Sequence, residues 1–160
     1  MCVKKLASIL LVLAIALLLA LSAYATSADA ASPAATGTVV KTIYYDNGCY
    51  AVIVITEGSS TRATKSGAKG YNFYNANGVL LWNVEITGTF TYDGSTSSCT
   101  NVTKSTKIYD GNWKVTAESC SKSGNKAYGD FTVKRYTLLV PVQTEVVNLV
   151  LACSPSGVLS

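Results

Sequence analysis

Histidine is absent from the 160-residue chain. Its absence excludes Ser-His-Asp and Cys-His nucleophilic sites, and it removes the commonest zinc ligand. A serine–lysine pair is the remaining arrangement of this kind, and Ser121-Lys122 and Lys104-Ser105 place the two residue types side by side. Because neighbours on a strand point to opposite faces of a sheet, neither pair indicates a nucleophilic site.

Motifs that bind metals, phosphates or nucleotides are also missing. The sequence has no C-x-x-C pair, no acid-rich calcium loop and no glycine-rich phosphate loop that opens a helix. Charged residues make up only 14% of the chain, and the 13 basic residues do not cluster. We therefore expect no metal, no cofactor and no nucleic acid as a partner.

The first residues have the order of a secretory signal. Two lysines precede residues 6–21, which are almost wholly apolar, and small residues follow, with A-x-A sites that end at Ala25 and Ala30. This order predicts a helical, cleaved signal peptide over residues 1–25, with cleavage at Ala30 as the alternative. The apolar run of 16 residues is shorter than the roughly 20 that a spanning helix needs, so a retained membrane anchor is the less favoured reading.

Two segments follow the signal. Residues 26–36 are rich in alanine, serine and threonine and have no apolar period, which predicts a disordered lead-in. Residues 37–160 fit a single domain. Loss of the leader lowers the net charge from +4 to +2, because two lysines leave and every acid stays. The sequence thus predicts a secreted, extracellular or wall-associated protein that is released rather than anchored.

Four cysteines remain beyond the leader: Cys49, Cys99, Cys120 and Cys153. An even number in an exported domain predicts two disulfides, for which three pairings exist. Cys153 continues the core-facing row of the last predicted strand, and Cys99 begins an earlier strand. We expect a Cys99–Cys153 bridge on that ground, and a Cys49–Cys120 bridge follows by elimination.

From residue 37 onward, β-branched and aromatic residues alternate with turn signals, and no amphipathic helix is evident. The longest pattern spans residues 80–92, where one parity is largely apolar and includes Trp82 and Phe90, while the other is mostly polar. Such alternation predicts one buried and one solvent-facing side, so both rings are expected in the core. Asn47-Gly48 indicates a tight hairpin turn between two earlier strands.

Seven or eight strands are expected, with turns every 8 to 14 residues. The sequence predicts an exposed loop over residues 57–68. It predicts strands over residues 38–45, 50–56, 70–75, 80–92, 99–109, 113–120, 127–139 and 142–153. This spacing predicts an all-β fold, an antiparallel two-sheet sandwich of immunoglobulin-like architecture, with a small barrel as the alternative.

Paired carboxylates are the remaining route to hydrolytic chemistry. The candidates are Asp46, Glu57, Glu85, Asp93, Asp110, Glu118, Asp130 and Glu145. Asp46, Asp93 and Asp110 come directly before Asn-Gly or glycine, where aspartate usually accepts a local backbone hydrogen bond in a turn. Glu85 falls on the polar, outward parity of its strand. No two acids are brought together by the pattern, so we predict no catalytic residues.

Tyrosine is the residue type that stands out, with ten copies. Exposed aromatic rings stack on sugars or anchor protein partners, whereas buried ones fill a sandwich core. Tyr45, Tyr71 and Phe73 lie outside the clearly buried rows. They are the predicted binding residues.

The second half carries a set of short stretches that form a recognisable pattern. They are Leu81-Trp82-Asn83-Val84, residues 87–96, Cys99-Thr100, Trp113-Lys114-Val115, residues 121–127, Cys153-Ser154 and residues 157–160. The pattern resembles a group of small exported β-rich proteins of Gram-positive, Firmicutes-type gut bacteria with no known function. The resemblance implies an extracellular β domain bridged by Cys99 and Cys153, and it implies no activity, substrate or cofactor. Cys49 and Cys120 are not part of it.

The leading interpretation is a secreted, non-enzymatic domain that acts by surface contact. Its partner would be a cell-wall polymer, a glycan or a protein. One alternative is a small polysaccharide or wall hydrolase that uses two carboxylates. The other is a bacteriocin-like toxin or a protease inhibitor.

Overall fold

The computed structural model describes residues 37–160, and the predicted signal peptide and lead-in lie outside the described residues. The described residues belong to one compact unit. They form eight antiparallel strands. The strands are β1 (Thr38–Tyr44), β2 (Tyr50–Thr61), β3 (Thr64–Tyr74), β4 (Leu80–Tyr92), β5 (Ser97–Ile108), β6 (Trp113–Ser123), β7 (Lys126–Thr137) and β8 (Val140–Ala152).

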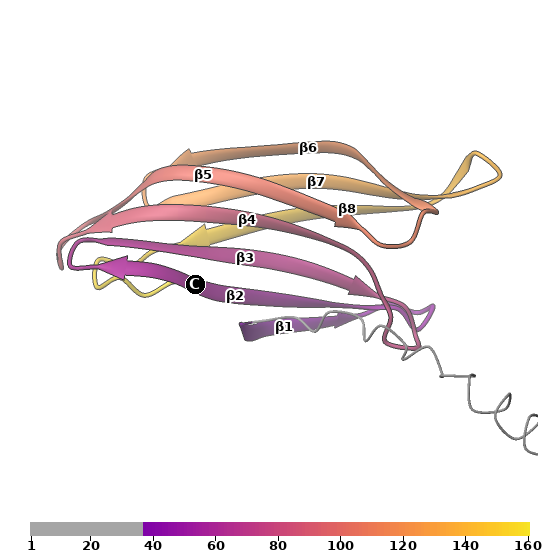
Figure 1. Ribbon diagram of the computed structural model, residues 1–160, viewed down its shortest axis with the longest axis horizontal. Coiled ribbons are helices and arrows are strands. Elements are labelled where there is room, and N and C mark those ends of the chain that lie inside the picture. The colour runs from indigo at the N-terminus through magenta and orange to yellow at the C-terminus, as the bar shows by residue number, and fades with distance from the viewer. Residues whose placement is uncertain (1–36) are drawn as a thin grey trace, which may run out of the picture. The chain divides into compact units, whose positions relative to one another are not determined.

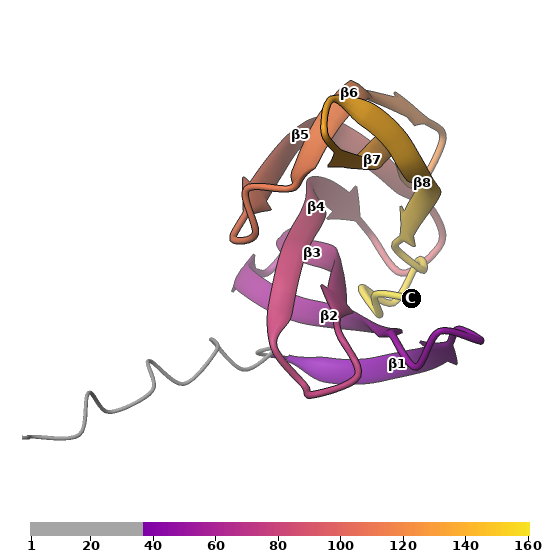
Figure 2. The ribbon, with the colours of Figure 1, turned by 90° about the vertical axis from the view of Figure 1, so that its right-hand side faces the viewer.

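The strands are divided between two sheets, a five-stranded sheet of order β1-β2-β3-β4-β5 and a three-stranded sheet of order β6-β7-β8. In Figures 1 and 2 the smaller sheet, in orange to yellow, lies above β1, β2 and β3 of the larger sheet, and β5 runs beside β6. The all-β, two-sheet prediction is therefore confirmed. The immunoglobulin-like connectivity is not shown, because within each sheet the strands pair in chain order and neither sheet contains a crossover.

The core lies between the two sheets, and β4 contributes its centre. Trp82, Val84, Ile86 and Phe90 are fully buried, and the residues of the opposite parity between them are only partly buried. This is the period of two that residues 80–92 predict, so the expected core positions of Trp82 and Phe90 are confirmed. The facing sheet supplies buried residues from β7 and β8, which are Ala127, Phe131, Val133, Val147, Leu149 and Leu151.

Residues 57–68 form a hairpin, and the prediction of an exposed loop is wrong there. β2 continues to Thr61 and β3 begins at Thr64, with Ser60 opposite Lys65 and Thr61 opposite Thr64. Threonine and serine give no apolar alternation, but threonine fits the pleat well, and both strands extend beyond the core as a ladder. The turn of this hairpin is reduced to Arg62 and Ala63.

The last hairpin also differs from expectation. The predicted strand of residues 127–139 ends at Thr137, and Leu138 and Leu139 form a two-residue turn with φ values of 49° and 69°. A left-handed conformation costs a residue with a side chain roughly 1–2 kcal/mol. Pro141 falls near the start of β8, an edge strand, where a missing backbone donor is tolerated.

Candidate functional site

The predicted binding residues Tyr71 and Phe73 do not form an exposed face. Phe73 is 0% exposed and Tyr71 is 5% exposed. β3 lies between β2 and β4, and its 71/73 row packs toward the core, where the rings of Phe73 and Tyr71 stack on Trp82 with centroids 4.9 and 5.6 Å away. The expectation of exposure is therefore wrong. Apolar and polar residues do not alternate clearly in this segment, so the sequence does not reveal that its aromatic row faces inward.

Tyr45, the third predicted residue, is partly buried and lies beside Tyr71, with their hydroxyl groups hydrogen-bonded. Glu145 of β8 faces this pair, and Gln143 Nε2 donates to its Oε1 at 2.9 Å. Burial, with the nearby Glu145 carboxylate, raises the pKa of both tyrosines. Both hydroxyl groups stay protonated at neutral pH, so the cluster ties β8 to β3 and does not supply a tyrosinate.

Two of the three aspartates predicted to serve turns, Asp93 and Asp110, do so. Asp93 Oδ1 accepts hydrogen bonds from the amides of Ser95 and Thr96 at 2.8 and 2.7 Å. These bonds hold the pKa of Asp93 below its usual value. Asp110 Oδ1 accepts a bond from the Asn112 amide at 2.9 Å.

The glutamates are spread over the domain. Glu57 pairs with Lys65 at 2.9 Å, and Glu118 pairs with Lys104 at 2.5 Å. The outward parity of Glu85 suggests that it lies in solvent, but the structure differs. Glu85 is half-buried, and burial raises its pKa. Among residues 37–160, no group of three or more cysteine, aspartate or glutamate side chains is arranged to hold a metal ion.

The four cysteines are thiols in the structure, and Cys99 and Cys153 lie near one another. The Cys99 amide donates to the carbonyl of Gly124 at 2.8 Å, and the Cys153 amide donates to that of Asn125 at 3.1 Å. The two backbones are thus anchored to successive residues of the β6–β7 turn. Burial raises the pKa of both thiols, and Cys153 contributes to the shift at Cys99.

Cys49 and Cys120 are not brought together. Cys49 precedes β2 at the end of the domain where Phe73 contacts Trp113, the first residue of β6. Cys120 lies seven residues further along β6, about 23 Å at the usual rise of a strand. A disulfide requires Cα atoms about 4.4–6.8 Å apart. The Cys49–Cys120 pairing stays a prediction, without support from this placement.

Under oxidising conditions we expect a Cys99–Cys153 disulfide that stabilises the fold by about 2–4 kcal/mol. Mass spectrometry of a non-reducing digest should yield a peptide containing Cys99 linked to one containing Cys153. A Cys99 peptide joined to Cys49 or Cys120, or recovered as a free thiol, would contradict this pairing.

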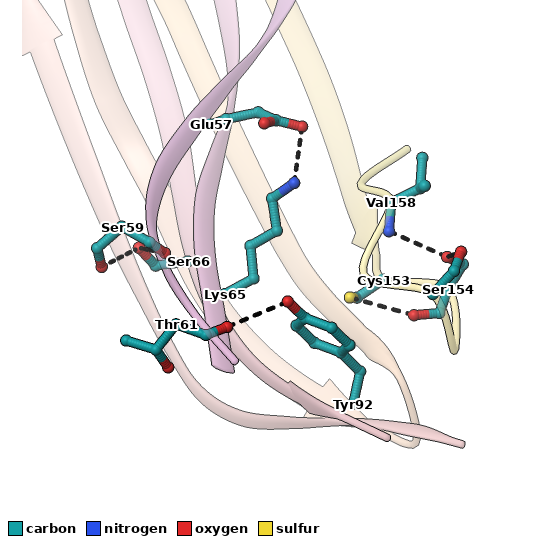
Figure 3. A network of polar contacts seen from close by, with 10 residues as sticks. Glu57, Ser59, Thr61, Lys65, Ser66, Tyr92, Cys153, Ser154 and Val158 are labelled. Carbon is teal, nitrogen blue, oxygen red and sulfur yellow. Dashed lines mark hydrogen bonds and ion pairs between the residues drawn. The ribbon is translucent and has the colours of Figure 1, made fainter. Parts of the chain in front are cut away.

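Three turns meet at one end of the domain and surround Tyr92, the last residue of β4. The Tyr92 amide donates to the carbonyl of Ala63 in the β2–β3 turn at 3.1 Å. Its hydroxyl donates to the carbonyl of Thr61 at 3.2 Å, as Figure 3 shows. The Gly94 amide in the β4–β5 turn donates to the carbonyl of Pro155 at 3.0 Å. These bonds fix the tyrosine and join all three turns.

Gly157 lets the C-terminal turn approach the Tyr92 ring. A Cβ atom at Gly157 would lie 2.8 Å from ring atoms Cε2 and Cζ of Tyr92, and the φ of 82° also favours glycine. The ring is therefore held from one side by backbone. This packing and the Thr61 bond restrict the orientation of Tyr92 before any ligand arrives.

Two adjoining hollows share Ala63, Tyr92 and Asp93 as walls. The first has a volume of about 430 Å³ and adds Arg62, Gly94, Pro155 and Ser156. The second has a volume of about 290 Å³ and adds hydroxyl-bearing residues, which are Thr64, Thr91, Thr96 and Ser98. The first lies within the range of about 300–1,000 Å³ that is usual for small-ligand sites. The two hollows therefore present an aromatic ring, one guanidinium group and several hydroxyl groups to a ligand.

Sequence reasoning missed this site. Tyr92 belongs to the inward row of residues 80–92, and Arg62 falls in the segment expected to be a loop. The available signal is the Asp93-Gly94 turn, which ends β4 directly after Tyr92. An inward-facing ring at the last position of a long strand lies at the rim of the core rather than within it.

Comparison of the chain with protein-family models, with curated proteins and with solved structures finds no match.

Proposed function

We propose that this chain is exported and that its β domain is a non-enzymatic binding module for a cell-wall glycan. The main support for this proposal is that Tyr92 forms a pre-oriented aromatic wall shared by two adjoining hollows. An aromatic ring offers an apolar face to the C–H side of a sugar, and its hydroxyl and the neighbouring threonines offer hydrogen bonds. Arg62 suits the carboxylate or phosphate groups of an anionic polymer.

The chemistry of the hollows favours binding over hydrolysis. Glycoside hydrolysis uses two carboxyl groups, one of them a proton donor. Asp93 is the carboxylate in the described walls of the hollows, and its oxygens accept bonds from Ser95 and Thr96. Those bonds lower its pKa, which works against proton donation. They also hold the side chain in the turn that it builds.

The test is a binding isotherm of the exported protein on purified, insoluble cell walls. We expect Tyr92→Ala to weaken binding at least tenfold, which corresponds to about 1.4 kcal/mol. Arg62 is exposed, and Arg62→Ala should weaken binding several-fold at low salt. At high salt, which screens the charge, the variant and the original protein should bind alike. Tyr109→Ala, which removes an exposed tyrosine outside the hollows, serves as the matched control and should bind like the original protein.

Circular dichroism of each variant checks that the fold is retained, and Tyr92→Phe should keep most of the binding because the ring stays. A folded Tyr92→Ala protein that binds walls with undiminished affinity would refute the proposed site. Continuous release of soluble sugar from the walls would instead establish turnover and refute the non-enzymatic assignment.

A further inference from the structure

The β7–β8 hairpin ends in an exposed apolar tip. Leu138 is 93% exposed and Leu139 is 88% exposed, and Val140 and Val142 that follow are also largely exposed. In Figure 1 this hairpin projects at the end of the strands opposite the β2–β3 and β4–β5 turns. Four neighbouring apolar side chains on one projecting turn are unusual for a surface that meets only water.

The backbone of the tip shows that local folding does not explain these residues. Two-residue hairpin turns with positive φ at both positions favour Asn-Gly, Asp-Gly and Gly-Gly. In the β1–β2 turn of this chain the positive φ falls on a glycine, Gly48, at 78°. At the β7–β8 turn, Leu138 and Leu139 instead hold φ values of 49° and 69°. Backbone strain of this kind clusters at functional positions, where the side chain matters more than local stability.

Basic and aromatic side chains lie just behind the tip. Lys114 Nζ lies 5.4 Å from the ring centroid of Tyr136, and Lys114 is paired with Lys134 across β6 and β7. Arg135 is the next residue along β7 and is exposed. Two basic positions therefore face each other directly, although like charges across a ladder repel.

Lys114, Lys134 and Arg135 form a positive collar behind the tip. In the described part of the chain, no acidic side chain next to the tip neutralises this collar. Residues 136–144 contain no aspartate or glutamate. Glu145, the first acid of β8, is half-buried beside Tyr45 and accepts a bond from Gln143. Asp110 at the same end is bonded to the amide of Asn112 in its own turn. The hairpin thus combines an apolar tip with an uncompensated positive collar.

We propose that the β7–β8 hairpin docks on an anionic lipid surface. Leu138 and Leu139 enter the boundary between headgroups and acyl chains, and Lys114, Lys134 and Arg135 contact lipid phosphates. Tyr136 lies at the level where tyrosine is enriched in membrane interfaces. Basic residues next to an inserted apolar segment are drawn to anionic headgroups, and their effect is screened by salt.

A lipid surface is favoured over a protein groove by the shape and charge of the hairpin. The leucines stand on a narrow turn rather than on a broad, flat face, and the cations surround it from β6 and β7. The described residues contain no helix that is long and apolar enough to cross a membrane. The proposed contact is with the membrane surface, and it does not depend on the Tyr92 hollows.

The test is co-sedimentation of the protein, purified after export, with vesicles of phosphatidylcholine containing phosphatidylglycerol. Leu138→Asn combined with Leu139→Gly places the preferred turn residues at the tip, so this variant should be at least as resistant to heat as the original protein. We expect it to bind vesicles at least tenfold more weakly. Val146→Asn, which replaces an exposed valine (66%) in the middle of β8, is the matched control and should bind normally.

Lys114→Ala with Lys134→Ala should also weaken binding, and high salt should abolish the difference from the original protein. Equal binding of the turn variant and the original protein would overturn the proposal. So would equal binding to vesicles of phosphatidylcholine alone, since the collar would then have no role. Binding to protein-containing membranes but not to lipid vesicles would reassign the tip to a protein partner and refute the lipid proposal.

Discussion

Phe73→Ala is expected to lower the free energy of unfolding by about 3–5 kcal/mol. The Phe73 ring is fully buried and contacts three other rings, Tyr45, Trp82 and Trp113, with centroids 4.9–5.4 Å away. Its removal leaves a cavity where the two sheets meet, and the surrounding rings lose both stacking and edge contacts. The two sheets relax only partly into such a cavity, so most of the cost remains.

Denaturant unfolding followed by tryptophan fluorescence measures this loss. Tyr44→Ala is the matched control, because Tyr44 is an aromatic residue that is 79% exposed. Its replacement should change the free energy of unfolding by less than about 0.5 kcal/mol. Similar, small effects of the two substitutions would show that Phe73 lies outside the core.

Gly129→Ala is expected to cost about 1–3 kcal/mol through overpacking between the sheets. A Cβ atom at Gly129 of β7 would lie 2.2 Å from Cγ2 of Ile86 in β4 and 2.9 Å from Cε2 of Phe131. Ile86 is fully buried, and its β-branched side chain has little freedom to move. The new methyl group must therefore push β7 away from β4.

Thermal unfolding gives the readout, and Gly111→Ala is the control with the same added methyl group. Gly111 lies in the β5–β6 turn with no atom within 4 Å of its Cβ position. That variant should be neutral or up to about 1 kcal/mol more stable. A Gly129→Ala protein as stable as the original would mean that β4 and β7 do not approach each other as described.

The sequence predicts the parts of this fold in which one rule dominates. β4 alternates over 13 residues, and its buried row follows directly from that period. Asn47-Gly48 marks the β1–β2 turn because glycine adopts positive φ at low cost, and Gly48, with a φ of 78°, takes the positive-φ position there. In both places local preference and tertiary packing agree.

Elsewhere tertiary packing decides the outcome. The residues of β3 from Tyr71 to Tyr74 are buried without interruption, so parity alone does not separate the inward from the outward row. Leu138 and Leu139 carry no turn signal, and the turn forms there because β7 and β8 pair on either side of it. The division into five and three strands falls between β5 and β6, which are chain neighbours that do not pair, and no residue type marks that break.

The candidate site could not be predicted for a related reason. Arg62, Tyr92 and Pro155 come from three distant turns, and only the hydrogen bonds among those turns place them together. The proximity of Cys99 and Cys153 follows more readily, because both begin or continue an inward row at the same end of the domain. The pairing of Cys49 with Cys120 is predicted only because the other two cysteines are already paired, and it has no such physical basis.

The proposed contacts lie at opposite ends of the strands, with Tyr92 at the end of β4 and Leu138 beyond the end of β7. Strands of about 12 residues separate them by roughly 40 Å at the usual rise. A domain that rests on a lipid surface by its β7–β8 hairpin would direct the Tyr92 hollows away from that surface. Such an orientation suits a partner in the wall.

The central claim is that the domain binds a wall glycan through the Tyr92 hollows. The most direct measurement is a titration of the isotope-labelled protein with soluble wall fragments, followed by backbone amide chemical shifts. We expect saturable shifts concentrated in the turns that carry Arg62, Tyr92 and Ser156. An absence of shifts at saturating fragment concentration, or shifts centred on a different surface, would contradict it.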